Sequence, residues 1–157
     1  MKYILGIDPG LSGAFALYNP EDGEVITEPM PTLKAGSGSK RVVDDVALAR
    51  WVDSWAEQIK MCYLEQVHAM PKQGVTSSFT FGMGYGIVKG IVAANMIPIT
   101  LVRPAVWKKA TGTPKVKDGA LARATQVFPR HSHQWPLKKD DGKAEAALIA
   151  YYGASQI

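Results

Sequence analysis

Hydrophobic and polar positions alternate in blocks along this chain, and the blocks predict strands and helices in a mixed order. Short runs of β-branched and aromatic residues between turn residues indicate strands, and apolar residues spaced by three or four indicate helices. The expected strands lie at residues 3–7, 14–18, 24–30, 61–67 and 97–102. The expected helices lie at residues 42–60, 79–95 and 115–128, with a short one opening at Pro104 and a last one from Ala144 onward.

The first expected strand ends in a carboxylate. Asp8-Pro9-Gly10 stops the apolar run, because Pro cannot donate to a central ladder and Gly tolerates a positive φ. The next strand follows at once, so a hairpin is expected. A carboxylate at the end of a buried strand is costly unless a metal ion, a phosphate-bound metal or an Arg compensates it. The alternative is an Asp that caps its own turn.

Three further acidic positions raise the same question. Glu65 interrupts the apolar strand at 61–67, although an edge-strand Glu pointing at water is an alternative. Asp141 and Glu145 are four residues apart, on one helical face near the start of the last helix. Two like charges there imply a cation or a partial proton. Acids that complement the helix dipole are the alternative.

The segments around these acids resemble three motifs of RuvC-type Holliday junction resolvases, which are RNase H-like nucleases. The matching segments are Ile4–Gly10, Leu64–Val67 and Lys138–Ala150, and the resemblance extends over nearly the whole chain. It implies an α/β, RNase H-like fold, with a mixed five-stranded sheet flanked by helices. Residues 1–157 would then form a single nuclease domain.

The resemblance also implies a catalytic site. Asp8, Glu65, Asp141 and Glu145 would be the catalytic and metal-binding residues, with Asp140 as the second choice to Asp141. The choice is open because many family members carry the first ligand three residues before the second, where this chain has Gly142. The implied chemistry is hydrolysis of phosphodiester bonds in four-way DNA junctions by a homodimer, with two Mg²⁺ per site and Mn²⁺ as a substitute.

Composition and charge are compatible with this hypothesis. The net charge of +4 is unevenly placed, because residues 103–143 carry ten Lys or Arg against three Asp. Such a segment suits a polyanion-binding surface, although a solvated charged face is the alternative. The residues expected to bind DNA are the basic Lys108, Lys109, Lys117, Arg123, Lys138, Lys139 and Lys143, and Lys72, Gln73 and Ser77 of the polar loop that follows Glu65. Trp107 and Trp135 could stack on bases or pack in the core.

The remaining features exclude some settings. No run of about 18 apolar residues exists, so no membrane span is expected. The single cysteine, Cys62, cannot form an intramolecular disulfide, and the cytoplasm of a bacterial or phage-infected bacterial cell is the expected compartment. A zinc site at His131 and His133 lacks a third ligand nearby. Residues 31–40 have the composition of a loop.

Several alternatives stay open. The chain could be another RNase H-like nuclease, acting on RNA or on other branched DNA, or a catalytically inactive DNA-binding relative. Residues 8–13 also resemble the phosphate turn of actin-like ATPases and sugar kinases, although those proteins need two similar domains. Gly82, Gly86 and Gly90 give one helix a smooth face, which a strand, a second subunit or a nucleic-acid backbone could approach.

Overall fold

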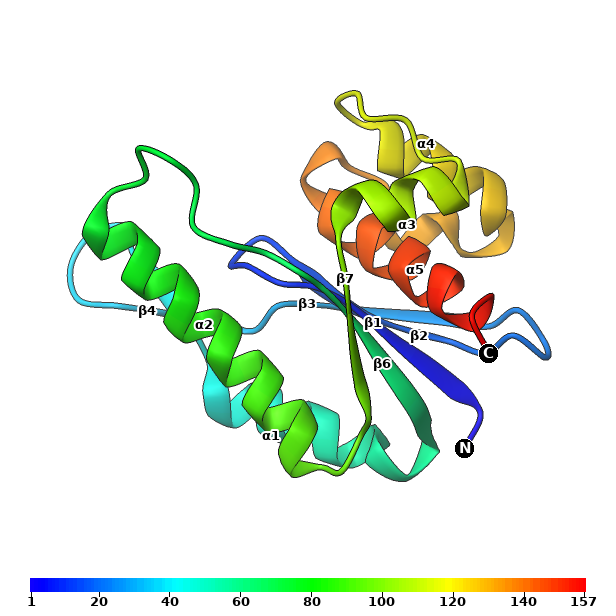
Figure 1. The fold of residues 1–157 in the computed structure, drawn as a ribbon, viewed down its shortest axis with the longest axis horizontal. Helices are drawn as coiled ribbons and strands as arrows, with labels where there is room; N and C mark the ends of the chain where they lie inside the picture. The colour runs from blue at the N-terminus through cyan, green and yellow to red at the C-terminus, as the bar shows by residue number, and fades with distance from the viewer.

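A mixed five-stranded sheet forms the centre of the computed structural model, which describes residues 1–157 (Figure 1). The strand order is β3-β2-β1-β6-β7, with β1 antiparallel to β2 and parallel to β6. The strands are β1 (Tyr3–Asp8), β2 (Ala14–Tyr18), β3 (Val25–Pro29), β6 (Ile59–Glu65) and β7 (Ile99–Val102). The fold class predicted from the sequence is confirmed.

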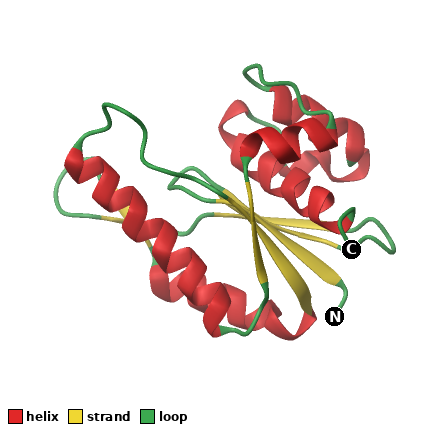
Figure 2. Ribbon diagram, viewed as in Figure 1, coloured by secondary structure: helices red, strands yellow, loops and turns green.

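Helices cover both faces of this sheet (Figure 2). One face carries α1 (Asp45–Trp55) and α2 (Val75–Ala94), and the other carries α5 (Asp141–Ala154). Two further helices, α3 (Pro104–Thr111) and α4 (Gly119–Val127), pack against α5 (Figure 1). Short 3-10 turns lie at Ala56–Gln58, Pro129–Gln134 and Lys138–Asp140. None of the helices is long and apolar enough to cross a membrane.

The alternation of side chains along β1 and β6 divides the core in two. On β1, Leu5 and Ile7 belong to the cluster shared with α1 and α2, whereas Ile4 belongs to the cluster shared with α5. Successive side chains of a strand point to opposite faces. Asp8 therefore falls on the α5 face, and Glu65 does so for the same reason, since its neighbour Leu64 faces α1 and α2.

Two glycines let α5 lie directly against the strands. A Cβ atom at Gly6 would come within 2.3 Å of the Ala146 carbonyl oxygen and 2.4 Å of the Ala150 nitrogen. A Cβ atom at Gly142 would lie 2.5 Å from the Ser12 carbonyl oxygen, in the turn between β1 and β2. Only a hydrogen atom fits at either position, and this close approach carries the first turns of α5 to the end of β1.

The prediction of a plain loop at 31–40 is wrong. The segment contains β4 (Thr32–Lys34), which pairs with β5 (Arg41–Val43) in a small hairpin. The Arg41 side chain ties the strands together, because its Nε and Nη2 donate to Oγ1 and O of Thr32 at 2.7 and 2.9 Å. Residues 42 and 43 are consequently strand, although a helix was expected to begin there.

Three helix boundaries also differ from expectation. The helix expected at 42–60 is shorter, because Asp44 caps the start of α1 by accepting from the Ala47 nitrogen at 3.0 Å and the helix ends at Trp55. Ile59 is the first residue of β6. Helix α2 begins at Val75, four residues earlier than expected, and includes Ser77. Helix α4 begins at Gly119, after Asp118 adopts a left-handed backbone. Residues 129–139, where no strand or helix is expected, consist largely of 3-10 turns. The polar run Thr76–Ser78 hides the start of α2 from a hydrophobic pattern.

Candidate metal centre

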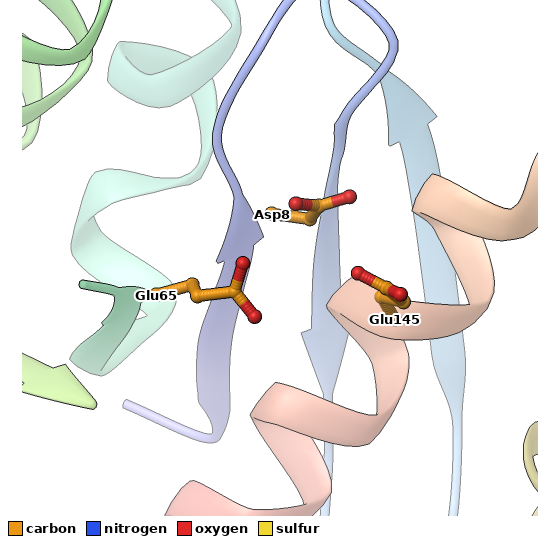
Figure 3. A group of neighbouring side chains, drawn as sticks. All are labelled: Asp8, Glu65 and Glu145. Atoms are coloured by element: carbon orange, nitrogen blue, oxygen red, sulfur yellow. The ribbon is translucent and has the colours of Figure 1, made fainter. Parts of the chain in front are cut away.

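Three carboxylates from distant parts of the chain meet at one end of the sheet. Asp8 ends β1, Glu65 ends β6, and Glu145 lies in the second turn of α5. Each offers one oxygen, and these oxygens all lie within 4.8 Å of one another (Figure 3). Because β1 and β6 are parallel neighbours, their carboxyl ends meet at the same edge. The site therefore follows from the strand order and from the path of α5.

Burial and mutual repulsion oppose the simultaneous ionisation of these carboxylates. Burial is the main cause that raises the pKa of Asp8 well above its ordinary range, and the charges of Glu145, Glu65 and Asp141 add to it. Burial, and then the charge of Glu65, raises the pKa of Glu145 to about 7. The pKa of Glu65 is also raised by burial. A cation among the three would favour their charged forms, which is the behaviour of a metal site.

Two consecutive residues of α3 contact this group. Trp107 is fully buried, and its Nε1–H donates to Glu65 Oε2 at 2.7 Å. Lys108 Nζ lies 3.9 Å from Glu145 Oε1. Both contacts lower the pKa of Glu65 or Glu145 against the larger effect of burial. Of the two alternatives for Trp107, stacking on bases and packing in the core, its burial confirms the core and excludes stacking.

The structure distinguishes the two neighbouring aspartates before Glu145. Asp141 is the exposed first residue of α5 and shares a cavity of about 180 Å³ with Glu145 and Lys108. Asp140 Oδ2 instead accepts from the Leu137 nitrogen at 3.0 Å and so belongs to the cap of a 3-10 turn. Neither aspartate is among the three carboxylates that meet within 4.8 Å. Gly142 faces the backbone of the β1–β2 turn, where no carboxylate would fit.

The residues expected to bind DNA fall into three groups. Lys108, Lys117 and Lys138 line the cavity that Asp141 and Glu145 share, so they lie beside the carboxylates. The second group contains the other four basic residues, of which Lys109 and Lys139 are exposed and Lys143 is half-buried. Arg123 is turned elsewhere, because its Nε donates to the Thr111 carbonyl oxygen at 2.6 Å and it lines a separate cavity of about 320 Å³ beside Arg130 and Tyr151.

The third group precedes and opens α2. Lys72 is exposed with a φ of 67°, and the Gln73 side chain donates to Ser77 Oγ at 3.2 Å while accepting from the Met70 nitrogen. Their role in DNA binding stays a prediction. Trp135, for which stacking and core packing were the two alternatives, is buried and donates to Thr125 Oγ1 at 3.0 Å, so it too belongs to the core.

The histidine pair lies apart from the carboxylates. The rings of His131 and His133 are 6.4 Å apart, and the structure brings no third metal-ligating side chain to them. The site residue that sequence analysis missed is Trp107, whose partner lies more than forty positions earlier. Gly6 is a second omission, and its signal was a glycine inside an otherwise apolar strand.

Comparison with solved structures shows what this arrangement resembles. A structure of Thermus thermophilus RuvC in complex with a Holliday junction substrate is similar over 99% of this chain and 96% of its own, with a TM-score of 0.68 and 13% identity. The chain has the RuvC fold. A second RuvC structure from T. thermophilus gives a TM-score of 0.59, with 13% identity and coverage of 98% and 96%.

A viral structure with the RuvC fold is similar too. The fowlpox virus Holliday junction resolvase has a TM-score of 0.54 at 16% identity, with 99% of both chains covered. No protein-family model and no curated protein sequence matches the chain. At these identities the comparisons show the fold, which is the one that the three sequence motifs implied.

Proposed function

We propose that this protein is a divalent-metal-dependent endonuclease that cuts four-way DNA junctions. The observation that carries the proposal is the meeting of Asp8, Glu65 and Glu145 at the edge of a sheet with the RuvC fold. The solved relatives named for Holliday junctions share that fold over nearly their whole length. The three motifs of the sequence support the same substrate.

The residues present fit a hard divalent cation. Carboxylate oxygens are the ligands that Mg²⁺ and Mn²⁺ prefer, and the one thiol, Cys62, is fully buried on the other face of the sheet. Burial, and then the charges of the neighbouring carboxylates, raise the pKa values of Asp8 and Glu145, and a bound cation would oppose both effects. Asp8, Glu65 and Glu145 would hold the metal, two Mg²⁺ in the proposed mechanism, and Asp141 beside them would contribute a further carboxylate. Bound metal would activate water and stabilise the leaving oxygen.

The protein's own residues supply orientation and charge. The sheet and α5 hold Asp8, Glu65 and Glu145 on rigid elements, so that the geometry changes little when DNA enters. Lys108, Lys117 and Lys138 place positive charge beside the carboxylates, where phosphates that flank the cut strand would lie. Lys109, Lys139 and Lys143 would extend this surface.

Assembly and compartment complete the proposal. A four-way junction has two strands to cut, and a homodimer with twofold symmetry places one site on each. We place the enzyme with its substrate, in the cytoplasm of a bacterial cell or a phage-infected bacterium.

The decisive experiment compares cleavage of a four-way junction with cleavage of a linear duplex, with and without Mg²⁺. We expect the junction to be cleaved only when Mg²⁺ is present, and the linear duplex not to be cleaved. We expect Asp8→Asn to abolish cleavage of the junction. Binding of the junction should survive in Asp8→Asn, because phosphate contacts from Lys and Arg supply most of the affinity. Asp53→Asn, an exposed aspartate on α1, is the matched control and should cleave normally.

Other outcomes would revise the proposal in specific ways. Cleavage by Asp8→Asn at the wild-type rate would contradict the metal site. Cleavage of RNA or of flaps in place of junctions would keep the metal site and change the substrate class. Junction binding without cleavage at any metal concentration would indicate an inactive relative.

A further inference from the structure

We propose that Trp107 is a positioning residue for the metal centre, because its indole N–H holds the Glu65 carboxylate in the orientation in which it meets Asp8 and Glu145. This inference rests on the proposed function, since it assumes that Glu65 is a metal ligand. It assigns a task to a residue of α3 that supplies no ligand of its own. The task is independent of which branched substrate the enzyme cuts.

The hydrogen bond is short and shielded from water. Trp107 Nε1 lies 2.7 Å from Glu65 Oε2, with Trp107 fully buried and Glu65 8% exposed. No other hydrogen bond reaches the Glu65 carboxylate, so its second oxygen is available to a cation. An indole N–H can only donate, and a bond from it to a charged oxygen is stronger than one to a neutral acceptor.

The donor itself is firmly held. Trp107 packs in the core cluster shared by α3, α4 and α5. Its helix begins at Pro104, directly after β7, and β7 is the strand that pairs with β6. The next turn is fixed as well, because Thr111 Oγ1 donates to the Trp107 carbonyl oxygen at 2.8 Å and lies 2.7 Å from Thr113 Oγ1. The indole therefore has little freedom to turn away from Glu65.

The need for such a donor follows from the repulsion at the site. Glu65 has a flexible side chain, and the charges of Asp8 and Glu145 favour conformations that point it away from them. A fixed N–H that is hydrogen-bonded to one oxygen of the carboxylate opposes this escape before any cation arrives. Partners that orient a ligand typically change metal affinity by about 10–100-fold when removed.

The same helix turn also holds a second carboxylate. Lys108, the next residue, places Nζ 3.9 Å from Glu145 Oε1 and 5.5 Å from the centre of the Trp107 ring. Consecutive residues of α3 thus contact two of the three carboxylates. Helix α3 braces the metal centre, although none of its residues is acidic.

The test compares two buried tryptophans that lose the same group. Trp107→Phe removes the N–H and keeps an aromatic ring, and Trp135→Phe does the same to an indole that donates to Thr125 Oγ1, away from the carboxylates. Binding of Mn²⁺ alone is measured by electron paramagnetic resonance of the free ion, without DNA. We expect about 10–100-fold weaker Mn²⁺ binding for Trp107→Phe and less than about threefold for Trp135→Phe. Junction binding in EDTA should be unchanged for both.

The outcomes separate this inference from the proposed function. Equal Mn²⁺ affinities for the two variants would overturn the role of Trp107 and leave the metal site standing. If Asp8→Asn binds Mn²⁺ as tightly as the wild type does, both the role of Trp107 and the proposed metal site are overturned. In a Glu65→Gln background, Trp107→Phe should cost no further affinity, and an additive loss would contradict action through Glu65.

A measurement on the wild-type fold covers the case in which Trp107→Phe unfolds. With ¹⁵N-labelled tryptophan, the four tryptophans give four indole N–H signals, and Mn²⁺ should broaden the one that lies beside the carboxylates. That signal should move upfield in Glu65→Gln, because the acceptor loses its charge. An indole signal that ignores the Glu65 substitution would overturn the inference.

Discussion

Helices α5 and α2 both carry glycines, and the two sets meet different surroundings. In α5, a Cβ atom at Gly142 would lie 2.5 Å from the backbone of the β1–β2 turn, and one at Gly153 would lie 2.3 Å from the Tyr63 ring. In α2, nothing lies within 4 Å of a Cβ atom built at Gly82, Gly86 or Gly90. The first set is covered by the sheet, and the second set faces away from it.

This difference separates two uses of one residue type. Each interior glycine costs a helix about 1 kcal/mol relative to Ala. In α5 that cost permits an approach close enough to carry Glu145 to Asp8, so it is part of the site. In α2 no other part of the chain packs against Gly82, Gly86 or Gly90. The same helix also exposes Val75, Phe79 and Met83. A sheet strand is therefore excluded as the partner of the α2 glycines, and a second subunit or DNA stays proposed.

The largest effect is expected where the sheet meets α5. Gly6→Ala would drive a methyl group into the backbone of Ala146 and Ala150, which cannot move without shifting the helix. We expect a loss of about 3 kcal/mol or more in the free energy of unfolding, measured by urea denaturation. A loss below about 1 kcal/mol would show that α5 can retreat, and Glu145 should then leave Asp8, with loss of Mn²⁺ binding.

A change of pH is expected to alter the free energy of unfolding by a comparable amount. The carboxylate considered, Glu145, lies on the α5 face of the sheet. The pKa of Glu145 rises from an ordinary 4.5 to about 7 in the folded chain. Between these values the unfolded chain holds fewer protons, so stability falls as pH increases from about 4.5 to about 7, by up to about 3 kcal/mol.

Urea denaturation without metal at about pH 5 and about pH 8 measures this dependence. Glu145→Gln should reduce it, with the remainder due to Asp8 and Glu65, whose pKa values are also raised. Saturating Mg²⁺ should restore the stability lost at the higher pH, since a ligand of the folded state stabilises it. A metal-free protein that is more stable at the higher pH would contradict the account of Glu145.

Substitutions at the start of α5 are expected to have a smaller effect, which is measured as the rate of junction cleavage. Asp141 shares a cavity with Glu145, whereas Asp140 caps the preceding turn. We expect Asp141→Asn to slow junction cleavage nearly as much as Glu145→Gln, by at least about tenfold, and Asp140→Asn to have a far smaller effect, with a modest shift in the Mg²⁺ requirement. The reverse order in single-turnover assays would show that Asp140 is the ligand.

The smallest effect is expected on α2, and with the opposite sign. Gly86→Ala adds a methyl group in open space and should raise the free energy of unfolding by about 0.5–1 kcal/mol. Gly84→Ala on the same helix is the control, because its Cβ atom would lie 3.2 Å from Val43 Cγ2 and should gain less. If Gly86→Ala instead weakens a dimer in sedimentation experiments, then the smooth face of α2 packs against a second copy.

Sequence reasoning recovered the elements whose pattern is local. The five strands of the main sheet and the hairpin after Asp8 follow from apolar runs and turn residues, and Gly10 has the positive φ that its turn requires. The β4–β5 hairpin was missed because a side chain, Arg41, holds it and no hydrophobic pattern marks it. Asp8 and Glu65 were selected as acids in or at the end of apolar strands, and Glu145 by its spacing from Asp141 and by the family resemblance. The structure brings these three together.

The parts that escaped prediction depend on distant contacts. Nothing near Trp107 in the sequence indicates that its donor reaches Glu65, and nothing near Gly142 indicates that its hydrogen atom faces the β1–β2 turn. Choosing between Asp140 and Asp141 likewise needed the Leu137 cap. Contacts of this kind are set by the packing of α5 and α3, which a periodic pattern does not describe.

The path of α5 has a consequence for the order in which the protein is made. Asp8 and Glu65 leave the ribosome early, and Glu145 follows only after every strand has been synthesised. Chains are synthesised at about 5–20 residues per second, and domains generally fold as units. A nascent chain without α5 has two of the three carboxylates and an uncovered sheet face, so the three-carboxylate group can assemble only when α5 has docked. Synthesis itself thus delays the proposed cleavage activity until α5 has joined the sheet.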